Sequence, residues 1–369
     1  MITKPKKLLA GSVAAVTAAA LLTGVGPAGL PAAQAATGSV KVLRTLVKGQ
    51  NVPWGLAKLS DNKIVYTERD THLIRWVNVR TGTFHTIGKI KPARSDPSAG
   101  GEGGLLGIAV DPQFSKTHVL YVYYSTAKDN RVARVHYYPN RAPYHQLGRP
   151  HVIKAGIPHG LHHNGGQLRF SPGGMLYVTT GDAENTSLPQ KKTSLGGKIL
   201  RITRYGKPAP NNPFKGSSVW SYGHRNVQGL SWDPSGRLWA SEFGDRKADE
   251  LNLIKKGHNY GWPATQGKTS HKGYTSPVAQ WGTEVDSPSG IAYTNNTIWM
   301  AALKGERLWR IPMHGAKAGT PKAFLVGKYG RIRGVLRLSP GKLLITTSNT
   351  DGRATPGRSD DRIIEVSVR

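Results

Sequence analysis

The side chains best suited to chemistry lie just ahead of a glycine that recurs along the chain. They stand one to five residues before it and comprise one acid, one imidazole, one amide and three guanidinium groups: Glu102, His163, Arg225, Asn226, Arg331 and Arg333. A neutral imidazole accepts a proton near physiological pH, and guanidinium groups bind carboxylates or phosphates. These residues predict a site where an anionic ligand lies beside a general base, His163.

The recurring glycine marks an internal repeat. Each copy has the glycine, alternating apolar residues, a turn and a second alternating run, and the glycines lie 44 to 63 residues apart: Gly55, Gly107, Gly166, Gly229, Gly290 and Gly334. Alternation with period two is typical of strands, and the Pro-x-Gly or Asn-Asn turns favour hairpins. The repeat therefore predicts six copies of a strand-turn-strand unit.

Six such units favour an all-β fold, a six-bladed β-propeller formed as one domain by residues 36–369. A single blade cannot bury both of its faces, whereas a closed ring can and also removes exposed sheet edges. The loops that enter equivalent strands of a propeller lie on one face around the axis, so the six polar residues are expected to converge there. A pair of β-sandwiches is the alternative architecture.

A second candidate site is the acid-rich segment 241–250, which is followed by the segment 259–263. A glycine-containing acidic loop after a strand offers carbonyl and carboxylate oxygens, the ligands that calcium prefers. The alternative is an acidic loop that only faces water.

The first 35 residues are typical of a secretory signal peptide. Lys4, Lys6 and Lys7 precede the apolar run 8–22, and the small-residue pattern 33–35 predicts cleavage near Ala35. An uncleaved membrane anchor is the alternative. With cleavage, the mature protein is expected to be secreted, extracellular or attached to the cell wall, and to have no membrane span.

Composition narrows the function classes further. The 369 residues include 51 Lys and Arg against 21 Asp and Glu, a formal charge of +30, and no Cys. The absence of Cys excludes disulfides, zinc-thiolate sites and cysteine nucleophiles. Because the basic residues are scattered and the chain is expected to be exported, an anionic cell-wall polymer is a better partner than nucleic acid.

Several ordered motifs carry a family resemblance that spans nearly the whole expected mature chain. The most specific are the segments 101–107, 163–166, 222–229, 249–263, 302–304 and 331–333. The sequence resembles the soluble quinoprotein sugar dehydrogenases. These are six-bladed propellers that use pyrroloquinoline quinone (PQQ) and calcium to oxidise aldoses at the anomeric carbon to lactones.

The resemblance implies a role for individual residues. His163 matches the catalytic base, and Arg225 and Asn226 match the pair that contacts the quinone, with Arg225 stabilising the negative charge that grows on it. Further matches are cofactor contacts at Glu102, Lys304, Arg331 and Arg333, calcium-binding carbonyls at Gly244 and Asp245, and a structural calcium site at Glu250 and Tyr260.

Three positions depart from the family pattern. Glu102 stands where the best-known members carry Gln, His162 replaces an acid that in some members neighbours the catalytic base, and Asp245 replaces a Pro. The long inserts linked to dimerisation in some relatives are not evident, so a monomer is expected. The resemblance also implies that the electrons pass to an external acceptor. The alternatives are a non-catalytic propeller that binds wall glycans and a calcium-dependent, lactonase-like hydrolase on the same fold.

Overall fold

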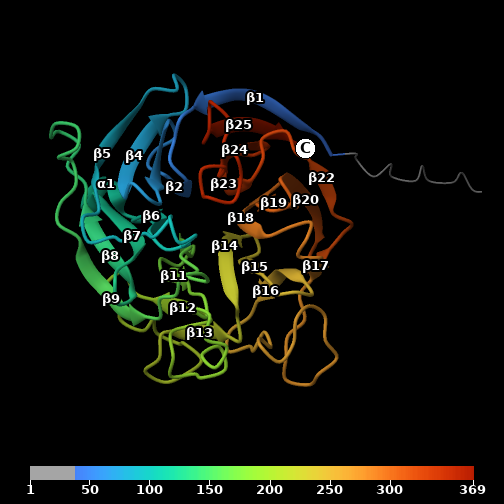
Figure 1. The fold of residues 1–369 in the computed structure, drawn as a ribbon. Coiled ribbons are helices and arrows are strands. Elements are labelled where there is room, and N and C mark those ends of the chain that lie inside the picture. Colours follow the sequence, from blue (N-terminus) through green and yellow to red (C-terminus); the bar gives the residue numbers. More distant parts are fainter. Residues whose placement is uncertain (1–37) are drawn as a thin grey trace, which may run out of the picture. The chain divides into compact units, whose positions relative to one another are not determined.

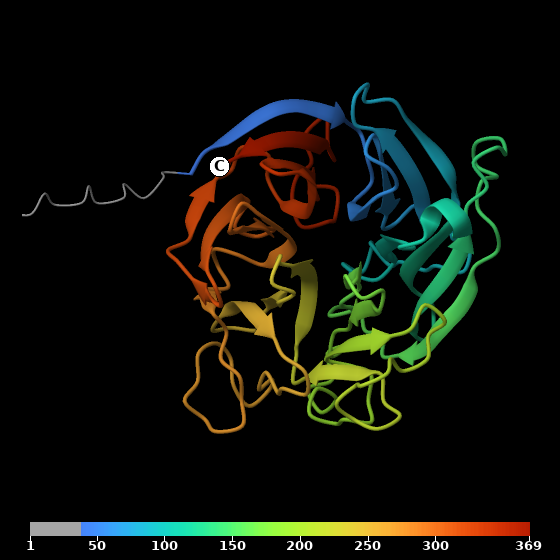
Figure 2. The same cartoon turned by 180° about the vertical axis from the view of Figure 1, so that it is seen from behind.

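Residues 38–369, the part of the chain described by the computed structural model, form six small antiparallel sheets around a central axis (Figure 1). Figure 2 shows the same ring from behind. The predicted six-bladed propeller is confirmed, whereas the predicted signal peptide lies outside the described residues.

Each blade takes its strands almost in chain order. The first three blades comprise β2 (Pro53–Lys58), β3 (Lys63–Glu68), β4 (Leu73–Asn78) and β5 (Phe84–Lys89); β6 (Leu105–Val110), β7 (Val119–Ser125), β8 (Asn130–His136) and β9 (His151–Ile157); and β10 (Leu168–Phe170), β11 (Leu176–Thr179), β12 (Lys198–Ile202) and β13 (Val219–Tyr222).

The other three blades complete the ring. They comprise β14 (Asn226–Trp232), β15 (Leu238–Phe243), β16 (Asp249–Ile254) and β17 (Ala279–Trp281); β18 (Pro288–Thr294), β19 (Thr297–Ala302), β20 (Arg307–His314), β21 (Lys317–Ala318) and β22 (Lys322–Phe324); and β23 (Ile332–Ser339), β24 (Lys342–Thr347), β25 (Ile363–Val368) and β1 (Val40–Val47). The one helix of the described residues, α1 (Phe114–Thr117), has four residues, and no described helix is long and apolar enough to cross a membrane.

The repeat glycines lie where the first strands of neighbouring blades, which we call the inner strands, touch around the axis. A Cβ on Gly107 would lie 2.1 Å from the carbonyl oxygen of Gly166, and one on Gly55 would lie 3.0 Å from the Cα of Gly107. A Cβ on Gly290 would likewise lie 3.1 Å from the Cα of Gly334. The glycines recur because these backbones approach too closely for any side chain.

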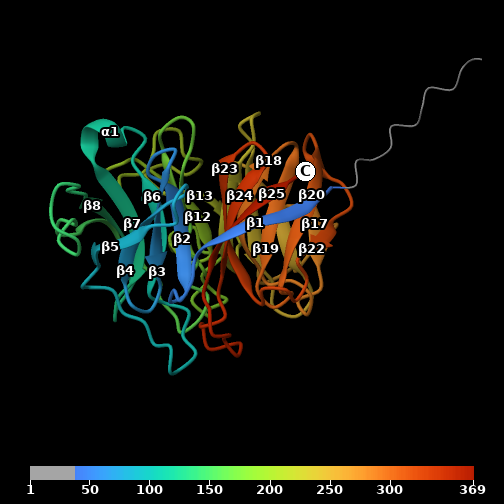
Figure 3. The ribbon, with the colours of Figure 1, turned by 90° about the horizontal axis from the view of Figure 1, so that it is seen from above.

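The ring is closed by the two ends of the described chain. The strand β1 pairs antiparallel with β25 on the outside of the last blade, and Val40 lies opposite Val368 (Figure 3). The last blade therefore combines the first strand of the described chain with its last three, which leaves no gap in the ring.

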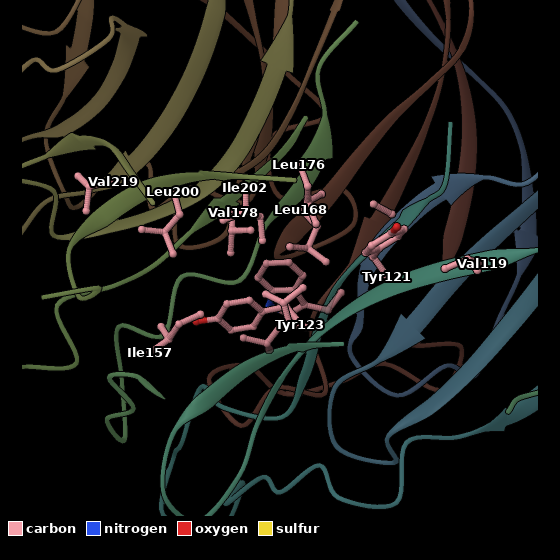
Figure 4. Packing of buried hydrophobic residues seen from close by; sticks show 14 residues of the cluster. Val119, Tyr121, Tyr123, Ile157, Leu168, Leu176, Val178, Leu200, Ile202 and Val219 are labelled. Atoms are coloured by element: carbon pink, nitrogen blue, oxygen red, sulfur yellow. The ribbon is translucent and has the colours of Figure 1, made fainter. Parts of the chain in front are cut away.

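Apolar residues of adjacent blades pack against one another to form the core. In one cluster, Tyr121 and Tyr123 of β7 pack with residues of the next blade, among them Leu168 and Val178 (Figure 4). The hydroxyl group of Tyr123 donates a hydrogen bond to the carbonyl oxygen of Asn164, 2.8 Å away. The core is thus tied directly to the loop that carries His163.

Candidate functional site

The loops that enter the inner strands surround a pocket of about 440 Å³. The structure brings together six of the predicted site residues there, since all of these line the pocket: Glu102, His163, Arg225, Lys304, Arg331 and Arg333. Trp54 and Ser287, which hold equivalent positions in the other two blades, form part of its wall. The expected convergence of these loops is therefore observed.

Buried polar contacts fix the loop that carries His163. The backbone of His163 has a φ of +55°, in the left-handed region that non-glycine residues seldom adopt. Its N–H donates to Oε2 of Glu102 at 3.2 Å, and the next residue, Asn164, accepts a hydrogen bond from Nδ2 of Asn130 at 2.9 Å. These contacts stabilise a strained backbone that presents the imidazole to the pocket.

Asp182, in the loop after β11, orients the imidazole. Oδ1 of Asp182 lies 2.8 Å from Nδ1 of His163, and Oδ2 accepts a hydrogen bond from the indole N–H of Trp262 at 2.8 Å. Burial raises the pKa of Asp182, but the hydrogen bonds and charge of His163 and the hydrogen bond from Trp262 outweigh it and hold the pKa below its usual value. The ionised carboxylate accepts a hydrogen bond from Nδ1–H of His163, so Nε2 is free to take a proton.

Arg225 lies close to this pair and contacts the acid-rich loop. Its carbonyl oxygen accepts the backbone N–H of Asp182 at 2.8 Å, and its guanidinium donates to Oδ1 of Asp245 at 3.2 Å. The side chain of Asp245 is therefore engaged in the site and not only its carbonyl group. The buried Nε of Arg225 has no hydrogen-bond partner in the described chain, which leaves a donor for a ligand.

Asn226 differs from the other predicted cofactor contacts, because its side chain does not line the pocket. It is fully buried, and its Oδ1 accepts the N–H of Gly165 at 3.0 Å. The amide nitrogen of Asn226 has no partner among the described residues. In this structure the side chain of Asn226 stabilises the loop that carries His163.

Arg331 and Arg333 share one carboxylate on the opposite side of the pocket. Oδ2 of Asp351 accepts a hydrogen bond from Nη2 of Arg331 at 3.0 Å and lies 3.4 Å from Nη2 of Arg333. Burial lowers the pKa of Arg333 to about 10, and Asp351 partly opposes that shift. Two guanidinium groups for one carboxylate leave a net positive charge in the wall.

The carboxylate of Glu102 is neutralised where it enters the pocket. Its Oε1 lies 3.4 Å from Nη2 of Arg353, which also donates to the carbonyl oxygen of Gly100 at 2.9 Å. Lys304 is more exposed and pairs with Glu284 at 2.6 Å. The acid at position 102 thus has a cationic partner in a different loop.

Sequence motifs did not indicate Asp182, Arg69 and Arg353, which orient His163 or line the pocket. Each lies in the loop after the second strand of its blade, namely β11, β3 and β24. Because a hairpin returns the chain to the face from which it started, these loops lie beside those that enter the inner strands. The second run of each repeat marks where these loops begin, but it does not mark which residue of the loop reaches the pocket.

The acid-rich loop lies beside Arg225 and encloses a separate cavity of about 10 Å³, lined in part by Glu242, Gly244, Glu250 and Tyr260. Asn252 donates to both Glu242 and Glu250, at 3.3 and 2.9 Å. Burial, followed by the charge of Glu242, raises the pKa of Glu250 to about 8. Two carboxylates therefore face each other in a buried space the size of a single water molecule or ion.

The other predicted metal ligands offer backbone oxygens. The hydroxyl group of Tyr260 donates to the carbonyl oxygen of Leu253 at 2.6 Å and accepts the N–H of Lys255, so only its backbone carbonyl remains for a metal. No group of three or more His, Cys, Asp or Glu side chains in residues 38–369 could hold a metal ion. A calcium ion here would depend on carbonyl oxygens and water as well as carboxylates.

The comparisons with known proteins agree with this architecture. The family model described as Glucose / Sorbosone dehydrogenase matches residues 50–356. The PQQ-bound form of an aldose sugar dehydrogenase from Streptomyces coelicolor has a similar solved structure, with a TM-score of 0.88 and 51% sequence identity. That match covers 90% of this chain and 99% of the other.

Two curated relatives are also similar. The aldose sugar dehydrogenase YliI of Escherichia coli is 30% identical over 86% of this chain and 92% of its own length. The quinoprotein glucose dehydrogenase B of Acinetobacter calcoaceticus is 32% identical over 70% of this chain and 61% of its own.

Proposed function

The chain belongs to the glucose/sorbosone dehydrogenase family and is a PQQ-dependent aldose sugar dehydrogenase; from this we propose that it oxidises aldoses at the anomeric carbon to lactones with PQQ and calcium. Electrons then pass to an external acceptor. The observation that carries the proposal is the His163–Asp182 pair, which faces a strongly basic pocket of about 440 Å³.

The residues of the pocket fit the cofactor. Six cationic side chains and a single carboxylate line it, a donor set suited to the three carboxylates of PQQ: Arg69, Arg225, Lys304, Arg331, Arg333, Arg353 and Glu102. The unpartnered Nε of Arg225 supplies a further donor. The volume lies in the range of sites that bind small molecules.

The acid-rich loop fits calcium. The cavity between Glu242 and Glu250 has room for about one ion, and a cation there would offset the repulsion between two buried carboxylates. We assign the structural calcium site to Glu250 and the backbone carbonyl of Tyr260. The carbonyls of Gly244 and Asp245, beside Arg225, are assigned to the calcium ion that serves the cofactor.

When bound, PQQ supplies a hydride acceptor and calcium polarises it. The protein moves the proton. Nε2 of His163 accepts the proton of the anomeric hydroxyl group, and the ionised Asp182 stabilises the imidazolium that results. Trp262 keeps Asp182 in place through its indole N–H.

The cationic side chains of the pocket bind and orient the anionic cofactor. Arg225 projects its guanidinium from the start of β14 toward the space beside His163 and stabilises negative charge there. Lys304, Arg331 and Arg333 hold carboxylates on the other side, and Arg353 keeps Glu102 from repelling them. The charge distribution thus fixes an anionic cofactor between the base and the basic wall.

We also propose that the protein is secreted as a monomer and that its positive charge attaches it to anionic wall polymers. The basic, apolar and small-residue pattern of residues 1–35 supports export. Only +3 of the formal charge of +30 lies in that segment, so the strongly positive charge that remains supports the attraction. Retention on wall preparations that does not fall as salt rises would count against the wall attachment.

The decisive test is a dye-reduction assay on the purified protein with a panel of aldoses, before and after PQQ and calcium are added. We expect activity only with both. The variant His163→Ala should retain the absorbance of the bound cofactor and lose turnover. Full activity of this variant after reconstitution would contradict the assignment of the base, and absence of both activity and cofactor absorbance in the wild-type protein would contradict the function.

A further inference from the structure

A second cavity lies on the propeller axis, bordered by five of the six inner strands. This axial chamber has a volume of about 10 Å³ and shares Trp54, Gln228 and Arg333 with the larger pocket. Its other lining residues are Leu56, Gln167, Arg169, Ser289, Gly290, Gly334 and Val335. The lining contains two guanidinium groups, two amides and a hydroxyl group, and no carboxylate.

Arg169, on β10, carries a charge that nothing in the described chain balances. Its single hydrogen bond there runs from Nε to the carbonyl oxygen of Leu230, at 3.3 Å. Burial lowers the pKa of Arg169 to about 10, so it remains a cation at neutral pH. Among residues 38–369, no carboxylate forms an ion pair with it.

Two buried cations of the described residues, by contrast, have partners. Arg333 lies 3.4 Å from Asp351, and the ammonium group of Lys198 donates to three backbone carbonyls at 2.6 to 2.9 Å. Arg169 is only half-buried, but a charge that is largely withdrawn from water is costly without a partner, and proteins normally pair it. Arg169 is the exception among these three.

Gln228 gives the chamber a second donor. Its Oε1 accepts hydrogen bonds from Nη1 of Arg333 and from the hydroxyl group of Ser289, both at 3.2 Å. These contacts fix the amide orientation, so its NH₂ end is directed away from both donors. Gln228 is only 5% exposed, and no acceptor among the described residues binds that nitrogen.

We propose that the axial chamber binds one small monovalent inorganic anion of the halide class, with Arg169 as its counter-charge and the amide of Gln228 as a second donor. A chamber with room for about one water-sized group excludes sugar acids and polyphosphates. One unpaired cation calls for a single negative charge. The anion would lie beneath the floor of the larger pocket and does not require the cofactor to be present.

The direct test is diffraction from crystals of the wild-type protein grown in sodium bromide, with data collected at the bromine absorption edge. We expect an anomalous peak in the chamber next to the guanidinium of Arg169. A chamber that contains only water, without anomalous signal at saturating bromide, would overturn the proposal.

A solution test uses Arg169→Met beside Arg337→Met, which removes an exposed arginine from another inner strand, β23. Thermal unfolding is compared in sodium bromide and in sodium methanesulfonate, whose anion is too large for the chamber, at equal ionic strength. At about ten times its Kd, bromide should raise the Tm of the wild type and of Arg337→Met by roughly 1–2 °C more than methanesulfonate.

Arg169→Met should lose this difference between the two salts. An equal bromide response in all three proteins would mean that only surface charge is being screened, and the proposal would fail. If Arg169→Met does not fold, the diffraction experiment on the wild-type protein still decides.

Discussion

Nδ1 of His163 lies 2.8 Å from Oδ1 of Asp182, and the second oxygen of the same carboxylate accepts the indole N–H of Trp262 at 2.8 Å. The three residues come from separate loops, and the backbone N–H of Asp182 is itself bound by the carbonyl oxygen of Arg225. The orientation of the base is therefore coupled to that of the arginine beside it.

Asp182→Asn should lower kcat by about 10²- to 10⁴-fold, because an amide no longer fixes the tautomer of His163 or stabilises its charged form. The affinity for PQQ, measured by absorbance titration, should change little. Glu184→Gln is the matched control, since Glu184 contacts the neighbouring His162 at 2.8 Å, and it should retain kcat within about threefold. An Asp182→Asn enzyme with near wild-type kcat would show that the pair is only structural.

Glu102→Gln should tighten PQQ binding by about 3- to 10-fold, because it removes a negative charge from the pocket and releases Arg353 to a carboxylate of the cofactor. Arg353→Met should weaken binding, since it leaves the acid unpaired. Equilibrium titration of both variants and of the double variant measures the coupling. Weaker binding in Glu102→Gln would indicate that the carboxylate itself holds the cofactor.

Chelation of calcium should lower the Tm of the wild-type protein, because a bound ion stabilises the folded state and its removal ends that stabilisation. Glu250→Gln removes one ligand of the ion, so its Tm should be nearly the same with and without EGTA. Asp61→Asn, which changes an almost fully exposed acid, should respond like the wild type. A Tm of Glu250→Gln that still falls in EGTA would place the ion elsewhere.

Asp351→Asn should destabilise the protein at pH 7, because Arg331 and Arg333 lose their shared partner. Burial raises the pKa of Asp351, but Arg333 and Arg331 outweigh it and hold the pKa below its usual value. Its stabilising effect is therefore complete above pH 4, about the unfolded pKa, and is lost as the pH falls through the lower folded pKa.

The difference in Tm between the wild type and Asp351→Asn should accordingly be largest at neutral pH and shrink below about pH 4. Thermal unfolding at several pH values measures it. A difference that stays constant down to pH 3 would refute the assigned role of the carboxylate.

Gly107→Ala should destabilise the fold by about 3 kcal/mol or more, because the added Cβ would lie 2.1 Å from the carbonyl oxygen of Gly166. Gly173→Ala is the control, since the nearest atom to its added Cβ is 3.9 Å away. Its stability should change by less than about 0.5 kcal/mol. Similar unfolding midpoints for the two variants would show that the inner strands can move apart.

The ring and half of the site could be predicted because both follow from the position of the repeat glycines. Backbone contact forces a glycine into or just ahead of every inner strand, so the loop before it is recognisable, and His163 and Arg333 lie in such positions. Asp182 and Arg353 carry no such mark, since the loops after the second strands vary in length and composition. Asp182 became identifiable only when the structure placed it 2.8 Å from the base.

The ion pairs of the pocket could not be predicted from the sequence either. Glu102 and Arg353 come from different blades and meet only in the folded ring. The role of Asp245 toward Arg225 also depends on where a side chain points, which motif and spacing do not specify.

The pairing of β1 with β25 sets an order of events during folding. Arg44 and Glu365 form an ion pair at 2.8 Å although 321 positions separate them in the sequence, so the last blade cannot form until the whole chain has been synthesised. Contacts between such distant segments slow folding, and until closure β25 lacks its outer partner and exposes an unpaired edge to other chains. Removal of Val40–Val47 would make that state permanent, since β25 would then keep an unpaired outer edge, and the expected result is aggregation.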